Sequence, residues 1–252
     1  MIAATLRCPK KAHFMKQAII IGASSGIGYE LAIQLAAQGY QLGLMARRIE
    51  RLNELSELLP GEHFVQVTDL VDTDIARTQL ASLIDVMGDV ELIVVNSGVG
   101  ASEKKLDWNV ESQMIDVNVR GFTAMSMDAM NHFLKRGGGH LVGVSSLAAH
   151  LSGGLALTYH ATKAFVSNYL NGMRSRAARS RLPITITTVE PGFIDTPMLE
   201  TKPIGTVSVE KAVTQLVRAI VRKKNHVYIT RRWILAAKII YVLPNWLIRK
   251  FV

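Results

Sequence analysis

The feature that most constrains this fold is a glycine-rich turn set between an apolar run and a helical pattern. Residues 18–21 are continuously apolar, as expected of a strand buried in a parallel sheet. The turn follows at 22–28, and residues 30–36 then repeat apolar side chains with helical periodicity. Glycines in this context let backbone N–H groups approach a pyrophosphate. The pattern predicts a dinucleotide site formed by Gly22, Ser24, Ser25, Gly26, Ile27 and Gly28. The alternative is a strand-to-helix turn whose glycines serve packing only.

Strand and helix patterns alternate along the rest of the chain. Further strands are predicted at 41–46, 63–67, 91–95, 140–144, 184–189 and 226–230, and further helices at 49–59, 73–87, 109–134, 158–178 and 208–224. This alternation is typical of a doubly wound parallel sheet, an α/β fold of the Rossmann-like type. We expect a single domain over residues 16–230, with its site at the carboxyl ends of the strands.

A tyrosine and a lysine four residues apart, Tyr159 and Lys163, begin the predicted helix at 158–178. That spacing places both on one helix face, one turn apart. A phenol with a pKa of about 10 is a poor acid or base at neutral pH, and a nearby ammonium favours its ionised form. The pair can then exchange a proton with an alcohol oxygen. The spacing alone is a weak indication, and Ser146, thirteen residues before Tyr159, strengthens it.

Two arginines, Arg47 and Arg48, end the second predicted strand, where the adenosine ribose of a dinucleotide would lie. An acid at this position would bind the ribose hydroxyls, whereas a cation suits a 2′-phosphate. Between the end of this strand and Glu50 there is no acid. We therefore expect NADP(H), with NAD(H) as the alternative if both arginines are merely solvated. Asp69 and Leu70 close the third strand, where they would flank the adenine.

Composition excludes several other classes of protein. Cys8 is the only cysteine, which excludes an internal disulfide, and no Cys/His cluster has metal-ligand spacing, so no metal site is predicted. No apolar segment of signal-peptide length follows the first basic residues, and we expect a cytoplasmic protein. Residues 1–15 are predicted to be a disordered extension, unless translation begins at Met15, directly before the first strand.

The net charge of +9 is concentrated near the C-terminus. Ten of the 29 basic residues follow Glu210, whereas none of the 20 acidic residues does. Residues 231–252 combine a narrow basic stripe with apolar side chains and aromatic rings, but Lys238 and Pro244 interrupt them, so a bilayer span is not expected. We predict a basic amphipathic helix that lies in the interface of an anionic membrane, with the inner face of a membrane as its site. Packing on the domain or on a dimer partner is the alternative, and nucleic-acid binding is not expected.

Together these motifs resemble the short-chain dehydrogenase/reductase family, the single-domain type, over residues 16–230. Asn118, Ser146, Tyr159 and Lys163 match the catalytic tetrad of that family. The positions that match its cofactor site are Gly22, Gly26 and Gly28 in the turn, Arg47 where NADP-preferring members carry a base, Asp69 in the adenine pocket, Asn96 and Gly98 after the fourth strand, and Pro191, Gly192, Ile194 and Thr196 near the nicotinamide amide.

The resemblance implies a mechanism. Tyr159 protonates the developing alkoxide or deprotonates the alcohol, while Lys163 lowers the pKa of that phenol and binds the nicotinamide ribose. Ser146 donates a hydrogen bond to the carbonyl oxygen, where charge develops. Asn118 holds a water that connects Lys163 to solvent.

This sequence departs from the family pattern at three positions. They are Ile21, where threonine is frequent, Val95, which replaces the first asparagine of the Asn-Asn-Ala-Gly segment, and Ser25, where many NADP users place a second cation. None of them touches the tetrad. Ser25 argues against NADP unless Arg48 compensates.

We therefore expect an NADP(H)-dependent oxidoreductase that interconverts a carbonyl and a secondary alcohol on an apolar substrate. Apolar residues suggest its pocket, although they would equally suit a buried loop base: Leu147, Leu151, Leu155, Met198, Leu199 and Ile204. The alternatives are an NAD-linked alcohol dehydrogenase, an epimerase, and an NADP(H)-binding scaffold or sensor without turnover. The resemblance also implies a homo-oligomer formed through the two long helices, with Phe165 and Tyr169 on their exposed face.

Overall fold

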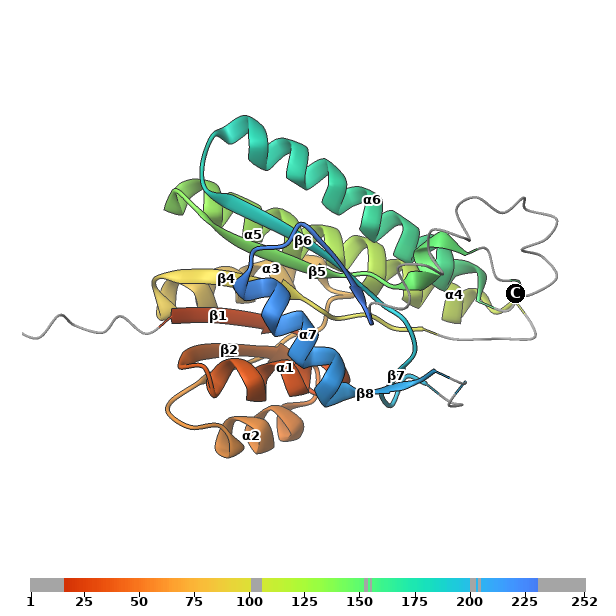
Figure 1. The fold of residues 1–252 in the computed structure, drawn as a ribbon, viewed down its shortest axis with the longest axis horizontal. Coiled ribbons are helices and arrows are strands. Elements are labelled where there is room, and N and C mark those ends of the chain that lie inside the picture. The colour runs from red at the N-terminus through yellow and green to blue at the C-terminus, as the bar shows by residue number, and fades with distance from the viewer. Residues whose placement is uncertain are drawn as a thin grey trace, which may run out of the picture.

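The computed structural model describes residues 16–100, 106–151, 154, 156–199, 203 and 205–230. The expectations for residues 1–15 and 231–252, and for Leu155 and Ile204, lie outside these residues. Within them the chain forms the predicted α/β fold (Figure 1).

Seven parallel strands form the central sheet in the order β3-β2-β1-β4-β5-β6-β9. Their bounds are β1 Lys16–Ile21, β2 Tyr40–Ala46, β3 Phe64–Val67, β4 Val90–Val95, β5 Gly139–Val144, β6 Ile184–Pro191 and β9 His226–Ile229. The order reverses at β1, because the chain runs outward to β3 and then returns to β4 on the other side. This switch point is where doubly wound sheets bind ligands, and it confirms the predicted fold class.

Helices cover both faces of the sheet, which explains why the strands read as continuous apolar runs. Along β1, Ile20 packs with one layer, whereas Ile19 and Ile21 pack with the other. The first layer contains α1 (Gly26–Ala36), α2 (Ile49–Leu58) and α7 (Val209–Val221), and the second contains α3 (Thr73–Met87), α5 (Phe122–Arg136) and α6 (Leu157–Ser180). Figure 1 shows α7 beside α1, and α7 also contacts β6 and β9.

The segment predicted as one helix at 109–134 is helical but not uniform. It consists of α4 (Trp108–Ile115), a π-helical segment η1 (Asp116–Gly121) and α5. Such segments widen the helix locally and often occur at functional sites. Here η1 contains Asn118, and Gly121 lies so close to Leu70 that a Cβ would stand 2.6 Å from the Leu70 Cβ. Apolar periodicity does not reveal this widening, which is why the sequence predicted a regular helix.

Three short elements were not predicted, and one helix is longer than expected. The short elements are a 3₁₀ turn η2 (Leu147–His150) and a two-stranded parallel pair, β7 (Ile194–Asp195) with β8 (Val207–Ser208). Helix α1 begins at Gly26 rather than near residue 30, because its first turn contains glycines that carry no apolar pattern. In the described residues, no helix is both long and apolar enough to cross a membrane.

Candidate active site

A cleft of about 940 Å³ opens at the carboxyl ends of the strands. Of the predicted site residues it is lined by Gly22, Ser24, Ser25, Gly26, Ile27, Arg47, Arg48, Asp69, Leu70, Asn96, Gly98, Ser146, Tyr159, Lys163, Pro191, Gly192, Ile194 and Thr196. Gly28 and Asn118 do not line it. The sequence therefore located the cleft, and these two residues support it from behind.

The glycine turn is packed too tightly for side chains. Gly22 has a φ of +95°, and a Cβ on Gly28 would lie 2.1 Å from the Gly22 carbonyl oxygen. That oxygen accepts a hydrogen bond of 2.9 Å from Nδ2 of Asn96, so the segment after β4 fixes the turn. Ser25 occupies the N-cap of α1 without a side-chain capping bond. The first N–H groups of α1 therefore keep their capacity to bind an anion, which fits a dinucleotide pyrophosphate.

The guanidinium of Arg48 lies over this turn. Its Nη2 donates to Oγ of Ser24 and of Ser25, both at 2.9 Å. Arg47 is exposed at the end of β2 and also lines the cleft. Ser25 stands where the family often places a second cation, and it accepts a hydrogen bond from Arg48, the arginine expected to compensate for that missing cation.

Asp69 is the only carboxylate among the described residues that line the cleft. It follows β3, and its Oδ1 accepts a hydrogen bond of 3.1 Å from the N–H of Val71. This local bond fixes the carboxylate at the end of the strand, beside Leu70. The predicted adenine-flanking pair is therefore in the cleft, on the side of Arg47 and Arg48.

The phenol of Tyr159 lies in the cleft close to Ser146. Burial raises the pKa of Tyr159, and a hydrogen bond with Ser146 opposes that rise. We expected Lys163 to lower this pKa, and the net direction is the opposite. The Nζ of Lys163 lies 5.7 Å from the centroid of the Tyr159 ring, so the two groups are near but not bonded.

Lys163 is itself almost fully buried. Its Nζ donates to the carbonyl oxygen of Val144 at 3.2 Å, and burial lowers the pKa of its ammonium from 10.5 to about 8. A Cβ on Gly98 would lie 3.1 Å from that Nζ, so the glycine leaves room for the lysine. The ammonium of Lys163 is therefore held in a narrow space between β5 and the segment after β4.

The carboxamide of Asn118 is hydrogen-bonded to protein through both its oxygen and its nitrogen. Its Oδ1 accepts from the N–H of Val99 at 2.9 Å, and its Nδ2 donates to the carbonyl oxygen of Val99 at 2.8 Å and to Oγ1 of Thr162 at 3.1 Å. The side chain thus holds the segment after β4 against the helix of Tyr159 and Lys163.

One wall of the cleft is apolar. The predicted residues Leu147, Leu151, Met198 and Leu199 line it, together with Val99 and Phe193. Gly100 approaches the ring of Tyr159, since a Cβ there would lie 3.1 Å from two ring carbons. Phe193 was not predicted to belong to this wall, although it directly follows the Pro191-Gly192 pair in the sequence.

Behind the cleft lies a buried carboxylate that the sequence analysis did not identify. Glu190, at the end of β6, is fully buried and accepts hydrogen bonds from His150 (2.7 Å), Ser167 (2.7 Å) and His226 (3.1 Å). Burial alone would raise the pKa of Glu190, but these bonds outweigh it and hold the pKa at about 2. The only signal in the sequence was an acid at the end of a predicted buried strand, directly before Pro191.

The contacts of Glu190 also change the pKa of His150 and connect to α6, the helix of Tyr159 and Lys163. The bond to Glu190 raises the pKa of His150 despite its partial burial. The hydroxyl of Ser167 also lies 2.8 Å from that of Ser145, which donates to the carbonyl oxygen of Lys163 at 2.8 Å. Glu190 therefore supports both sides of Ser146. Among the described residues no three His, Cys, Asp or Glu side chains gather as metal ligands.

Comparison with known proteins agrees with this organisation. The family model described as short chain dehydrogenase matches residues 16–205. An uncharacterized oxidoreductase of Mycobacterium tuberculosis is 33% identical over 249 residues, covering 92% of this chain and 96% of that protein.

Solved structures show the same fold. A short-chain dehydrogenase/reductase from Burkholderia phymatum, in complex with NAD, has a TM-score of 0.82 at 20% identity and covers 89% of this chain and 92% of its own. A short-chain dehydrogenase from Sphingobium yanoikuyae, in complex with NADPH, has a TM-score of 0.80 at 20% identity, covering 89% and 93%. From the family match and the cleft together, the chain belongs to the short-chain dehydrogenase/reductase family of nicotinamide-dependent oxidoreductases.

Proposed function

We propose that this protein is an NADP(H)-preferring oxidoreductase that interconverts a carbonyl and a secondary alcohol on an apolar substrate. The observation that carries the cofactor preference is the pair Arg47 and Arg48 at the end of β2, where no carboxylate other than that of Asp69 lines the described part of the cleft. Two cations there suit a 2′-phosphate, and an acid that would bind ribose hydroxyls is missing from that position. Structural neighbours hold either form of the cofactor, NAD in one and NADPH in another.

Tyr159 is the proposed general acid and base. The bound nicotinamide supplies or accepts the hydride, which is chemistry that belongs to the cofactor. In the reducing direction Tyr159 gives its proton to the carbonyl oxygen, and Ser146, which hydrogen-bonds that phenol, donates to the same oxygen. The raised pKa of Tyr159 keeps the phenol protonated at neutral pH, which favours its role as an acid in carbonyl reduction.

Lys163 and Asn118 support that proton transfer. The buried ammonium of Lys163 favours negative charge on the phenol after the proton has left, and its lowered pKa brings it within range of proton exchange near neutral pH. The side chain of Asn118 fixes Val99, and the proposed water between Lys163 and solvent would bind the main chain of η1. The apolar wall of Leu147, Leu151 and Phe193 would receive the substrate's hydrocarbon part.

The first test is fluorescence titration of the purified protein with NADPH and with NADH. We expect tighter NADPH binding, weakened about tenfold or more in Arg47→Ala and Arg48→Ala, because each would lose a hydrogen-bonded contact between charged groups. NADH binding should change little. Arg51→Ala is the matched control, since Arg51 is an exposed arginine of the same region that pairs with Glu54 outside the cleft.

Other outcomes would point to the alternative functions. Equal or tighter NADH binding that ignores both arginines would contradict the preference and favour an NAD-linked alcohol dehydrogenase. Tight NADPH binding without turnover across a screen of apolar ketones, aldehydes and alcohols would favour a scaffold or sensor. Interconversion of stereoisomers without net change in NADPH would favour an epimerase.

We also propose that the protein is a homo-oligomer that associates through α5 and α6. Phe165 is 37% exposed and stacks on Tyr169 at 5.6 Å between ring centroids, and Tyr169 in turn meets Phe122 edge-on. This places a rigid aromatic pair on the outer side of α6, where a partner would bury it. Analytical ultracentrifugation of Phe165→Glu against wild type tests the proposal, and an unchanged mass would contradict it.

A further inference from the structure

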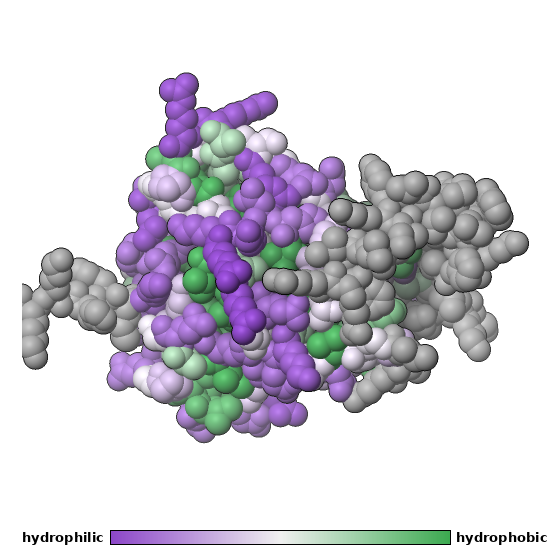
Figure 2. All heavy atoms as spheres, viewed as in Figure 1, coloured by the Kyte–Doolittle hydropathy of each residue, from purple (hydrophilic) through white to green (hydrophobic). Residues whose placement is uncertain are grey.

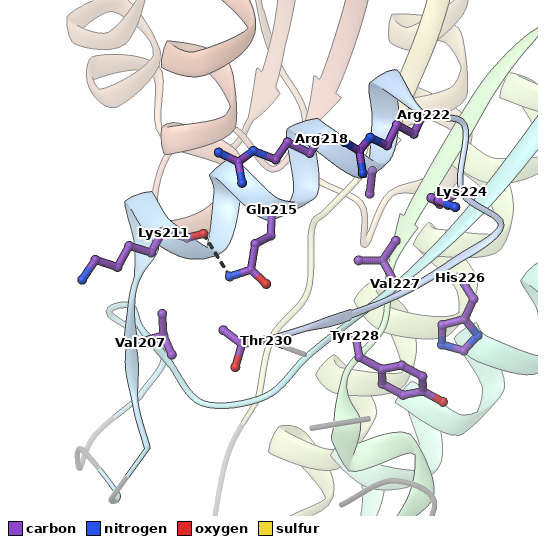
Figure 3. A pocket seen from close by; sticks show the side chains of 11 residues that line it. Val207, Lys211, Gln215, Arg218, Arg222, Lys224, His226, Val227, Tyr228 and Thr230 are labelled. Carbon is purple, nitrogen blue, oxygen red and sulfur yellow. Dashed lines mark hydrogen bonds between the residues drawn. The ribbon is translucent and has the colours of Figure 1, made fainter. Parts of the chain in front are cut away.

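A second hollow, of about 1010 Å³, lies between α7 and the edge strand β9. Among the described residues, none lines both this hollow and the cleft. Its described lining is Val207, Lys211, Gln215, Arg218, Ala219, Arg222, Lys224, His226, Val227, Tyr228 and Thr230 (Figure 3). We call this surface the α7 groove. It has apolar residues along its base and basic side chains on its helical wall.

The basic side chains of the groove follow one face of α7. Lys211, Gln215, Arg218 and Arg222 are spaced four, three and four residues apart, which places them on one helix stripe. The opposite stripe of α7, with Leu216 as its centre, is buried against the sheet. Figure 2, seen from the same side as Figure 1, shows hydrophilic side chains over this helix.

Within the described part of the chain the groove cations form no ion pair, whereas four other arginines do. Arg51, Arg77, Arg120 and Arg136 each form an ion pair with an aspartate or glutamate. Among the described residues, by contrast, no carboxylate forms an ion pair with the four groove cations, which are Lys211, Arg218, Arg222 and Lys224. All four are exposed. The groove therefore presents uncompensated positive charge.

All the groove residues except Val207 follow Glu210, the last acidic residue of the sequence. After Glu210 the chain carries ten basic residues and no acidic one, and the five that lie beyond β9 are Arg231, Arg232, Lys238, Arg249 and Lys250. Rings that favour membrane interfaces, Trp233 and Trp246, stand among these last residues. The sequence after Glu210 therefore carries only one sign of charge.

We propose that the α7 groove binds the surface of a bilayer that contains anionic phospholipids. Lys211 and Arg222 lie eleven residues apart on α7, about 16 Å along the helix axis, so the stripe reaches several headgroups at once. Basic residues close to an anionic surface act additively and are screened by salt. The inference concerns a surface that the cofactor and the substrate do not use, so it is independent of the proposed function.

Two other occupants fit the groove less well. A second copy of the chain related by a twofold axis would bring the cations of one α7 against those of the other, which is repulsive. An acidic protein segment would neutralise the groove cations, but it would leave the interface-favouring rings of the following sequence unexplained. Both are outcomes that the experiment distinguishes.

The test is flotation of the full-length protein with vesicles of phosphatidylcholine alone or mixed with phosphatidylglycerol. We expect wild type to bind only the mixed vesicles and to be released by raising the salt. The double variant Arg218→Glu/Arg222→Glu should lose at least about tenfold in partition onto mixed vesicles. The milder Arg218→Gln/Arg222→Gln, which removes two positive charges without adding negative ones, should lose less, and it guards against misfolding of the first variant.

The matched control is Arg176→Glu/Arg179→Glu, which reverses two exposed arginines on α6 outside the groove. It should bind mixed vesicles within about twofold of wild type. NADPH binding should be unchanged in all three variants, because the groove and the cleft have no lining residue in common.

Three results would overturn the proposal. The first is equal binding of wild type and Arg218→Glu/Arg222→Glu, or an equal loss in the α6 control. The second is binding to soluble polyglutamate but not to mixed vesicles, which would identify an acidic protein as the partner. The third is a change of molecular mass in Arg218→Glu/Arg222→Glu without any vesicle binding by wild type, which would make the groove an interface between copies.

Discussion

The cleft and the α7 groove are hollows of similar volume that are built in opposite ways. The cleft lies where strands end, and its shape depends on main chain and on buried groups such as Lys163, with glycines that leave no room for a Cβ. The groove lies on the outside of one helix, and its chemistry depends on exposed side chains such as Arg218. A buried, crowded site has few tolerated substitutions, whereas an exposed stripe can change its charge with little effect on folding.

The largest effect is expected from Tyr159→Phe, on the cleft side of the comparison. Losing the proposed general acid should reduce turnover of any ketone that wild type reduces by about 10² to 10⁴. NADPH affinity should stay within about threefold, because the ring remains. The measurement is the rate of NADPH consumption at 340 nm alongside fluorescence titration. Turnover within a few fold of wild type would remove Tyr159 from the mechanism.

The next effect is a pH dependence caused by Glu190. Its pKa is about 2 in the folded protein against 4.5 in the unfolded chain, so its stabilisation is present above pH 4.5 and is lost as the pH falls through about 2. The loss amounts to about 3 kcal/mol.

His150 gives a pH dependence of the opposite sign, because its pKa is raised in the folded protein. Its contribution to stability is present below pH 6.5 and is lost as the pH rises through the folded pKa.

Urea unfolding between pH 7 and pH 2 measures this dependence. Glu190→Gln should lower the free energy of unfolding at pH 7 by about 2 kcal/mol and flatten the acid slope between pH 4.5 and 2. An acid slope equal to that of wild type would show that other carboxylates cause it. The contrast between the two hollows would then be wrong on this point, since the residues around the cleft would not depend on the buried carboxylate of Glu190.

Two matched glycine substitutions should change the stability of the fold by smaller amounts, and in opposite directions. Gly28→Ala should destabilise the fold by roughly 1–3 kcal/mol or more, because the added Cβ would lie 2.1 Å from a main-chain oxygen. Gly172→Ala, in the middle of α6 with nothing within 4 Å of its Cβ position, should stabilise by about 0.4–1 kcal/mol. Thermal melting of both variants decides the matter, and equal shifts would show that crowding at the turn is unimportant.

The smallest effect is expected in the groove. Arg218→Glu/Arg222→Glu should change the free energy of unfolding by about 0.5 kcal/mol or less, since both side chains are exposed and neither forms an ion pair with a described residue. The same urea titration at neutral pH measures it. A loss of several kcal/mol would mean that these arginines stabilise the fold, and the contrast between the two hollows would disappear.

The sequence predicted the sheet and the place of the cleft because both depend on local patterns. Continuous apolar runs such as residues 18–21 require burial on both faces, and a glycine turn after such a run has few other uses. Ser146, Tyr159 and Lys163 meet because they stand at a strand end and at a helix start, which the fold brings together.

What could not be predicted depends on contacts between distant segments. The π-helical η1 places Asn118 against Val99, and no periodicity marks it. The upward shift of the Tyr159 pKa is caused by burial, which the spacing of Tyr159 and Lys163 does not reveal. The Glu190 network joins β6, α6, η2 and β9, four elements whose proximity follows only from the strand order.

That network has a consequence for how the molecule opens. His150 stands four residues after Ser146, whereas His226 begins the edge strand that borders the α7 groove, and both bond to the same carboxylate oxygen of Glu190. An edge strand would ordinarily fray on its own, exchanging its amide hydrogens before the rest of the sheet. Here, release of β9 exposes the buried carboxylate of Glu190, which also binds His150 in the segment after Ser146. Strand β9 and the segment 146–150 should therefore open with the same free energy. The amide hydrogens of β9, beside the groove, and of residues 146–150, beside the cleft, should then exchange together as one cooperative unit.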